Sequence, residues 1–158
     1  MSSISTCASP THAVKCNTSQ FTLARLTKTC LQMVHRWFGG DIPITKMRDL
    51  CDLSIDGVSM QGMARAAEHL GLEALATHVA HDTLEELPLP FIAHWLGEHF
   101  VVVTAITARR ITVADPELGL VTYRRDAFMR HWCGKKVFGE IQVSEQDLAA
   151  PGAVLLLA

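Results

Sequence analysis

The sequence lacks the features that mark membrane, secreted or nucleic-acid-binding proteins. No apolar run reaches the roughly 18 residues that a membrane span requires. Residues 1–11 are polar and have no apolar stretch of the kind found in secretory signals. The net charge is −2 and only 19% of the residues are charged, so no basic field favours nucleic acid as a partner.

Paired cysteines of the Cys-x-x-Cys kind are also missing, and the total of five cysteines is odd. We therefore expect free thiols in a reducing, cytoplasmic setting. The eight histidines form no His-Glu-x-x-His motif and no Cys/His zinc pattern. Neither a metal nor another cofactor is expected. The basic pairs Arg109-Arg110, Arg124-Arg125 and Lys135-Lys136 are expected at solvated strand ends or turns.

Hydrophobic residues make up 49% of the 158 residues, which is enough for the core of one ordinary domain. Residues 1–18 are rich in serine, threonine and small side chains and are expected to form a flexible tail. Residues 19–145 should form the domain. Residues 146–158 are expected to be a C-terminal extension, and their apolar end, 153–158, is either a last strand or the beginning of a longer polypeptide.

The period of the hydrophobic residues changes halfway along the chain. Apolar residues at helical spacing predict helices within 23–37, 44–51 and 60–70. After residue 73, short apolar segments with turn residues between them predict strands. These strands are expected at 73–79, 90–96, 99–106, 110–114, 119–124 and 137–143. Helices followed by an antiparallel sheet define an α+β protein.

Two strand ends carry a candidate acid–base pair. His99 opens one predicted strand and Asp115 closes the next. A carboxylate in that position holds an imidazole in one tautomer, and the pair then serves a nucleophile. A cysteine nucleophile is well placed at the N-terminus of a helix, where the helix dipole stabilises the thiolate. By itself, His99 would be an ordinary strand-edge histidine. The presence of Asp115 at the end of the next predicted strand favours a His99–Asp115 pair.

The order of these motifs resembles the bacteriocin-processing papain-like peptidases, family 39 of the cysteine peptidases. These usually form the N-terminal domain of bacterial ABC exporters. The family begins with a glutamine, then five residues, Cys-Gly, two residues and Cys-Leu-x-Met-Val. This chain has Gln20, Leu26-Thr27, Cys30-Leu31 and Met33-Val34 at those positions. Later matching segments, which extend the resemblance to Val143, are Gly57–Met60, Ala66–Leu72, Leu89–Trp95, His99–Val102, Val113–Pro116 and Trp132–Gly134.

The resemblance implies a papain-like fold, with an N-terminal helical lobe packed on an antiparallel sheet. It assigns Gln20 to the oxyanion position and His99 and Asp115 to the acid–base positions. Leu26 falls on the nucleophile, and leucine has no ionisable proton and no lone pair for His99 to activate. The resemblance therefore implies a degenerate peptidase domain that is not an enzyme.

Peptidase-like domains of this kind imply binding of an unfolded export substrate or its leader peptide. The expected partners are this cargo and the membrane and nucleotide-binding domains of an ABC exporter of the type I secretion kind, in the same or a separate chain. The expected location is the cytoplasmic face of the bacterial inner membrane. A cleft between helices and sheet would bind peptide through Leu26, Trp95 and His99; for Trp95, filling the core is the alternative.

Two other functions remain open from the sequence. The chain is then either an active cysteine peptidase with a displaced nucleophile, Cys30 or Cys16, or a free-standing peptide-binding regulatory domain. Cys30 lies four residues from Leu26, about 6 Å of helical rise. A thiol–imidazole hydrogen bond requires roughly 3 Å, which disfavours Cys30.

Overall fold

The computed structural model describes the backbone of residues 18–52 and 59–158, and the side chains of residues 27–50 and 59–158. The expected tail therefore lies outside the described residues, apart from Thr18, which begins the first helix. Cys16, one of the two candidate displaced nucleophiles, lies outside them as well.

Three helices form the N-terminal lobe, as predicted. They are α1 (Thr18–Trp37), α2 (Ile44–Asp52) and α3 (Met60–His69). In α1, Cys30, Leu31 and Val34 are fully buried at the spacing of one helix face. Helix α3 begins at the Ser59 side chain, which accepts a hydrogen bond from the Gly62 amide. No helix in 18–52 or 59–158 is long and apolar enough to cross a bilayer.

An antiparallel sheet of six strands, in the order β1-β8-β2-β3-β4-β5, follows the helical lobe. The strands are β1 (Ala74–Val79), β2 (Phe91–Trp95), β3 (His99–Ile106), β4 (Arg110–Asp115), β5 (Gly119–Arg124) and β8 (Gly152–Leu157). Around it lie the 3-10 helix η1 (His81–Glu86), α4 (Arg125–Cys133), α5 (Glu145–Ala149) and the hairpin of β6 (Lys135–Val137) and β7 (Glu140–Gln142).

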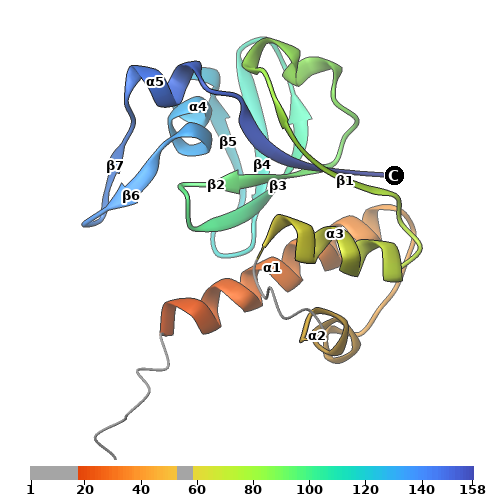
Figure 1. Cartoon of the computed structure of the whole chain (residues 1–158). Coiled ribbons are helices and arrows are strands. Elements are labelled where there is room, and N and C mark those ends of the chain that lie inside the picture. The colour runs from red at the N-terminus through yellow and green to blue at the C-terminus, as the bar shows by residue number, and fades with distance from the viewer. Residues whose placement is uncertain (1–17, 53–58) are drawn as a thin grey trace, which may run out of the picture.

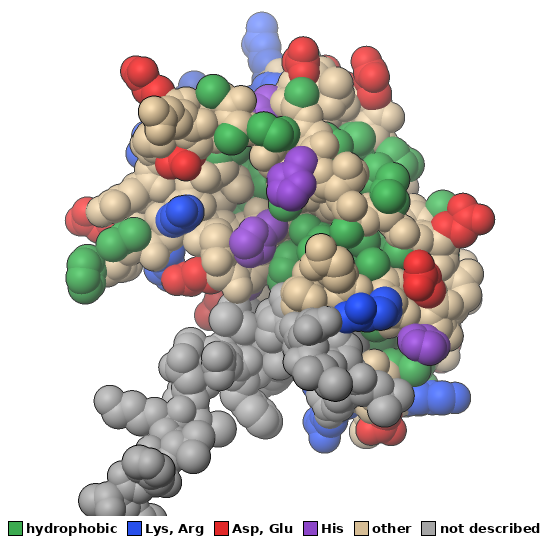
Figure 2. All heavy atoms as spheres, viewed as in Figure 1, with side chains coloured by type: hydrophobic (Ala, Val, Ile, Leu, Met, Phe, Trp, Pro, Cys, Tyr) green, Lys and Arg blue, Asp and Glu red, His purple; other side chains and the backbone are tan. Residues whose placement is uncertain are grey.

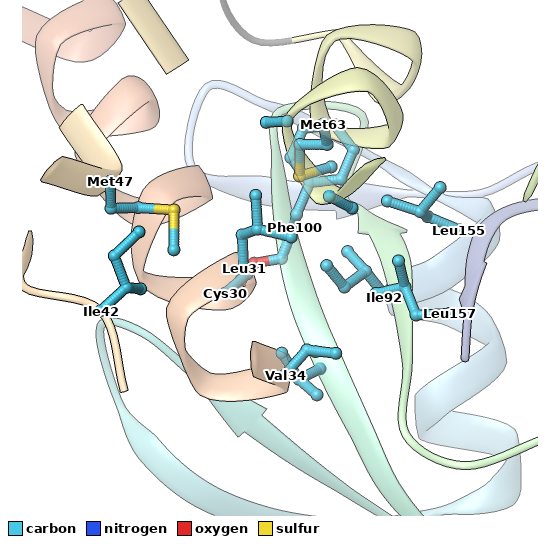
Figure 3. Close-up of a cluster of buried hydrophobic side chains, with 13 residues drawn as sticks. Cys30, Leu31, Val34, Ile42, Met47, Met63, Ile92, Phe100, Leu155 and Leu157 are labelled. Carbon is cyan, nitrogen blue, oxygen red and sulfur yellow. Dashed lines mark hydrogen bonds between the residues drawn. The ribbon is translucent and has the colours of Figure 1, made fainter. Parts of the chain in front are cut away.

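The sheet separates two hydrophobic layers, because successive residues of a strand face opposite sides. Helices α1 to α3 cover one face, and α4 and α5 lie on the other side (Figure 1). Phe100 and Leu155 point into the helical layer, where they meet Cys30 and Leu31 of α1 (Figure 3). Val101 and Val154 point the other way and pack near Phe128 and Trp132 of α4. The predicted fold class, α+β with a helical lobe on an antiparallel sheet, is confirmed.

The C-terminal residues belong to this domain, so the predicted boundary at 145 is wrong. Strand β8 lies between β1 and β2 and is paired with both. The last strand that was expected within residues 153–158 is observed. Its residues are apolar on both sides because both faces of a central strand are buried. The single strand predicted for 137–143 is instead the β6–β7 hairpin, which turns at Phe138 and Gly139, both with positive φ.

Charged side chains are scattered over the face shown in Figure 2 and lie mostly near its rim. On that face, no single sign of charge forms a continuous field. This distribution agrees with the small net charge of −2.

Candidate functional site

The structure brings His99 and Asp115 together at neighbouring strand ends. His99 begins β3 and Asp115 ends β4. The Nε2 atom of His99 lies 3.7 Å from the Oδ2 atom of Asp115, and both side chains are largely buried. This distance is longer than a hydrogen bond but short enough for an ion pair with a protonated imidazole.

Asp115 has a second role, which fixes its position. Its Oδ1 atom accepts hydrogen bonds from the backbone amides of Glu117 and Leu118, at 2.8 and 3.3 Å. These bonds close the turn between β4 and β5. The other carboxylate oxygen is thereby aimed at His99, so one residue supports both the turn and the pair.

The imidazole of His99 keeps unused hydrogen-bonding capacity. Its Nε2 atom is buried and has no hydrogen-bond partner within the described part of the chain. Because Nε2 faces Asp115, Nδ1 is the nitrogen that remains for a nucleophile or a bound group. Next to it, burial and then the neighbouring His99 lower the pKa of His94. His94 is therefore neutral at neutral pH.

Leu26, which the resemblance places at the nucleophile, does not lie at a helix N-terminus as expected. Helix α1 begins at Thr18, so Leu26 lies eight residues inside it. An amide in a helix interior donates to the carbonyl four residues earlier and is not available to an oxyanion. Gln20 also lies in α1, about 9 Å of helical rise from Leu26. The side chains of Gln20 and Leu26 lie outside the described residues.

Cys30 is a buried thiol with a structural hydrogen bond. Its Sγ atom donates to the carbonyl of Phe100 at 3.1 Å, next to His99 in β3. Burial, and to a smaller extent the charge of Asp115, raise the pKa of this thiol far above its usual value. Since the thiolate is the nucleophilic form, Cys30 does not meet the requirement for a displaced nucleophile.

Cys133 forms a second Cys–His contact, which the sequence did not reveal. Its Sγ atom lies 3.2 Å from Nε2 of His81. Burial and then Asp147 raise the pKa of Cys133 to about 11, so the thiol stays protonated at neutral pH. The two residues are 52 positions apart, and no sequence pattern connects them.

Trp95 does not line a binding cleft, and this prediction is wrong. Its side chain is 1% exposed and stacks on His131 with ring centroids 5.1 Å apart. It also contacts the rings of Tyr123 and Phe128. The alternative, core filling, is the observed role. Across the residues that the structure describes, no three His, Cys, Asp or Glu side chains are grouped as metal ligands would be.

Comparison with known proteins agrees with the fold. Residues 18–143 match the Peptidase C39 family, and the chain belongs to this family. It is 33% identical over 115 residues to the lactococcin-G-processing and transport ATP-binding protein LagD of Lactococcus lactis subsp. lactis, covering 69% of this chain and 16% of that protein. It is 34% identical over 117 residues to the transport/processing ATP-binding protein ComA of Streptococcus pneumoniae, covering 68% and 16%. The chain thus spans about a sixth of the length of these relatives.

Solved structures show the same fold. A double glycine motif protease from an AMS/PCAT transporter, in complex with the leader peptide, superposes with a TM-score of 0.66 at 24% identity and covers 85% of this chain and 84% of that one. The peptidase domain of Streptococcus ComA gives a TM-score of 0.64 at 19% identity, with coverage of 85% and 91%. The predicted family and the predicted papain-like architecture are both confirmed.

Proposed function

We propose that this Peptidase C39 domain binds the leader peptide, or an unfolded segment, of an export substrate without cleaving it. The observation that carries the proposal is Leu26 at the nucleophile position, in a chain that keeps His99 and Asp115 side by side. An aliphatic side chain cannot attack a carbonyl carbon. The remaining base has nothing to deprotonate at that position.

Two further features support the absence of cleavage. Among the side chains that the structure describes, the two free thiols, Cys30 and Cys133, have raised pKa values and are protonated at neutral pH. The continuous helix through Leu26 also removes the free backbone amide that a nucleophile at a helix N-terminus would contribute to an oxyanion hole.

Peptide binding does not require the nucleophile. A protease of the same fold has been solved with its leader peptide. Nδ1 of His99, the ring nitrogen that does not face Asp115, offers a hydrogen-bonding site. Since the relatives named above are processing and transport proteins, we infer that the partner is an ABC exporter. The domain would then act at the cytoplasmic face of the inner membrane.

The decisive experiment uses a synthetic double-glycine leader peptide that extends past the two glycines. Mass spectrometry should show no cleavage by the wild-type protein or by His99→Ala. Fluorescence anisotropy with the same peptide should show saturable binding of about micromolar affinity. Cleavage by the wild type that His99→Ala abolishes would refute the non-catalytic proposal. No measurable binding would refute the recognition of leader peptides.

A displaced nucleophile is tested separately by thiol labelling. We expect iodoacetamide to modify no cysteine rapidly below pH 8, and the slow labelling that occurs should be equal in wild type and His99→Ala. Rapid labelling of Cys16 or Cys30 that slows in His99→Ala would favour an active cysteine peptidase instead. Cys16→Ala provides the matched control, since it removes the second candidate thiol.

The gene sequence tests whether the proposed exporter is part of the same polypeptide. Several apolar segments of spanning length after Ala158, followed by Gly-x-x-x-x-Gly-Lys-Ser/Thr, would support an exporter in one polypeptide. A stop codon there would favour a free-standing regulatory domain or an exporter encoded separately. Co-purification with a neighbouring transporter would distinguish these two possibilities.

A further inference from the structure

Four arginines surround an open cavity at the end of the sheet farthest along β4 from Asp115. The cavity has a volume of about 750 Å³ and is lined by Ala108, Arg109, Arg110, Arg124, Arg125 and Asp126. It forms where the β3–β4 turn meets the junction of β5 and α4, which the Arg125 amide ties together by donating to the Arg109 carbonyl at 3.0 Å. We call it the arginine cavity.

The charges of this cavity are not balanced within the domain. Arg110 and Arg124 are direct cross-strand partners in β4 and β5. Like charges in that position destabilise a sheet. Among the residues that the structure describes, Arg124 pairs only with the exposed Asp126, whose Oδ1 atom lies 3.5 Å from Nε of Arg124. In the same part of the chain, no acidic side chain pairs with Arg109 or Arg110.

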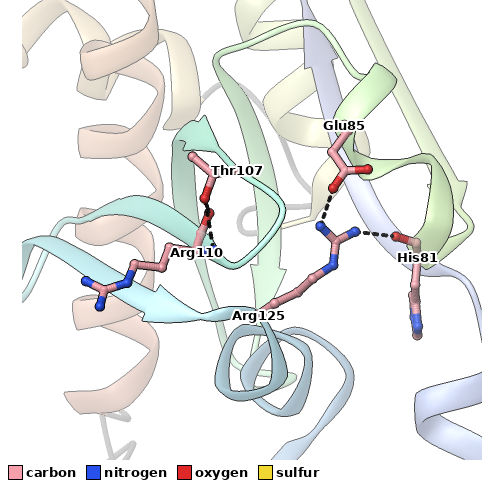
Figure 4. A network of polar contacts seen from close by, with 5 residues as sticks. All are labelled: His81, Glu85, Thr107, Arg110 and Arg125. Atoms are coloured by element: carbon pink, nitrogen blue, oxygen red, sulfur yellow. Dashed lines mark hydrogen bonds and ion pairs between the residues drawn. The ribbon is translucent and has the colours of Figure 1, made fainter.

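Arg125 differs from the other three because its guanidinium group is already held. Nη1 contacts Oε1 of Glu85 at 2.5 Å and Nη2 donates to the carbonyl of His81 at 3.4 Å (Figure 4). The Arg110 side chain instead extends away from this network (Figure 4). The guanidinium group of Arg125 is therefore already held. Those of Arg109 and Arg110 pair with no acidic side chain among the described residues, and that of Arg124 pairs only with the exposed Asp126.

The surface next to the cavity suits an extended peptide. On the same face as the Arg110–Arg124 pair, Thr112 and Thr122 are cross-strand partners with hydroxyl groups 3.0 Å apart. Leu120, further along β5, is 75% exposed. Strand β5 is also an edge of the sheet, and an edge strand can accept a further strand. From Arg124 to Leu120 an extended chain covers about 13 Å.

We propose that the arginine cavity binds acidic residues of an extended segment of the export cargo, which lies along β5. The guanidinium fork matches a carboxylate in two parallel hydrogen bonds. The concave shape and the adjoining strand edge favour a peptide over a flat anionic membrane. Acidic-peptide binding at the arginine cavity rests on the proposed function in one respect only, which is that the peptide is export cargo.

The test compares two short fluorescent peptides of identical sequence, except that alternate positions near one end carry glutamate in one and glutamine in the other. Each is titrated against the wild-type protein and against Arg110→Gln/Arg124→Gln. The control variant, Lys46→Gln/Arg48→Gln, removes the same charge from exposed positions on α2. Vesicles of neutral and anionic phospholipid are titrated in parallel.

We expect the glutamate peptide to bind about tenfold or more tightly than the glutamine peptide, since two charge-assisted bonds are gained. The arginine double variant should lose this preference, and the α2 control should keep it. Equal affinity for the two peptides would overturn the proposal. So would a loss of vesicle binding in the arginine variant with peptide affinity unchanged. A double-glycine leader that still binds uncleaved in either case shows that the proposed function stands independently.

Discussion

Cys30 and Cys133 owe their raised pKa values mainly to the same cause, which is burial of the sulfur atom. For Cys30 the nearby carboxylate of Asp115 adds to this effect, and for Cys133 that of Asp147 does. A buried thiol with these neighbours loses its proton only with difficulty. The chemistry of both residues is therefore decided by their surroundings and not by the number of cysteines.

This leads to a prediction about stability at alkaline pH. The pKa of Cys133 is about 11 in the folded protein against an ordinary 9.0. A pKa raised on folding stabilises the fold below pH 9.0, and this stabilisation is lost as the pH rises towards 11. The urea midpoint should fall between pH 9 and 11, and it should fall less in Cys30→Ala/Cys133→Ala.

Comparing the slopes of midpoint against pH isolates the thiols, because the double variant also loses some stability at pH 7. Parallel slopes in the two proteins would show that neither thiol is held in its protonated form by the fold. Tyr123, whose pKa is raised by burial and by Asp115, contributes equally to both slopes and cancels.

At the scale of elements, β8 depends on α4. Gly152 begins β8, and a Cβ atom there would lie 2.1 Å from Cζ2 of Trp132. The indole of Trp132 also donates to the carbonyl of Ala153 at 3.2 Å. The start of β8 is therefore held directly against α4, and only a residue without a side chain fits at position 152.

Gly152→Ala should consequently destabilise the protein by about 1–3 kcal/mol, since the added methyl group forces Trp132 to move. The free energy of unfolding in urea measures this effect. Gln146→Ala, at an exposed position on the adjoining α5, is the control and should change it by less than about 0.5 kcal/mol. Equal effects of the two substitutions would contradict the close packing of β8 against α4.

For the whole molecule, the shared sheet couples the two hydrophobic layers. Val154 and Leu155 are neighbours in β8, yet Val154 packs with Trp132 and Leu155 with Cys30 and Leu31. Loss of β8 pairing would therefore expose both layers at once. A single cooperative transition follows, as for most small domains.

We expect Leu155→Ala to lower the thermal midpoint of helical circular dichroism and of tryptophan fluorescence together, with a loss of about 2–5 kcal/mol. Trp95 and Trp132 lie in the layer that Leu155 does not touch, so their fluorescence reports the coupling. Phe128→Leu, in the layer on the opposite face of the sheet, should also lower the midpoints of both signals together. Separate midpoints for the two signals would show that the layers unfold independently.

Much of the fold could be predicted from the chain because local patterns were clear. Hydrophobic residues spaced three and four apart located the three helices of the N-terminal lobe, and those spaced two apart located the strands β2 to β5, to within a few residues. The patterns missed the β6–β7 hairpin, and for β8 they gave a last strand as only one of two alternatives. A short apolar run at a chain end does not reveal that its partner is β1, more than 70 residues earlier, and a positive φ at Phe138 has no sequence signal.

By itself, the sequence determined that residue 26 is leucine and that His99 and Asp115 stand at the ends of consecutive strands. Those properties are covalent or local. Only the tertiary structure decided that Cys30 bonds to Phe100, 70 positions away, that Trp95 is buried, and that two arginine pairs meet around one cavity. The physical reason is that burial, pKa and charge balance depend on which distant segments the fold packs together.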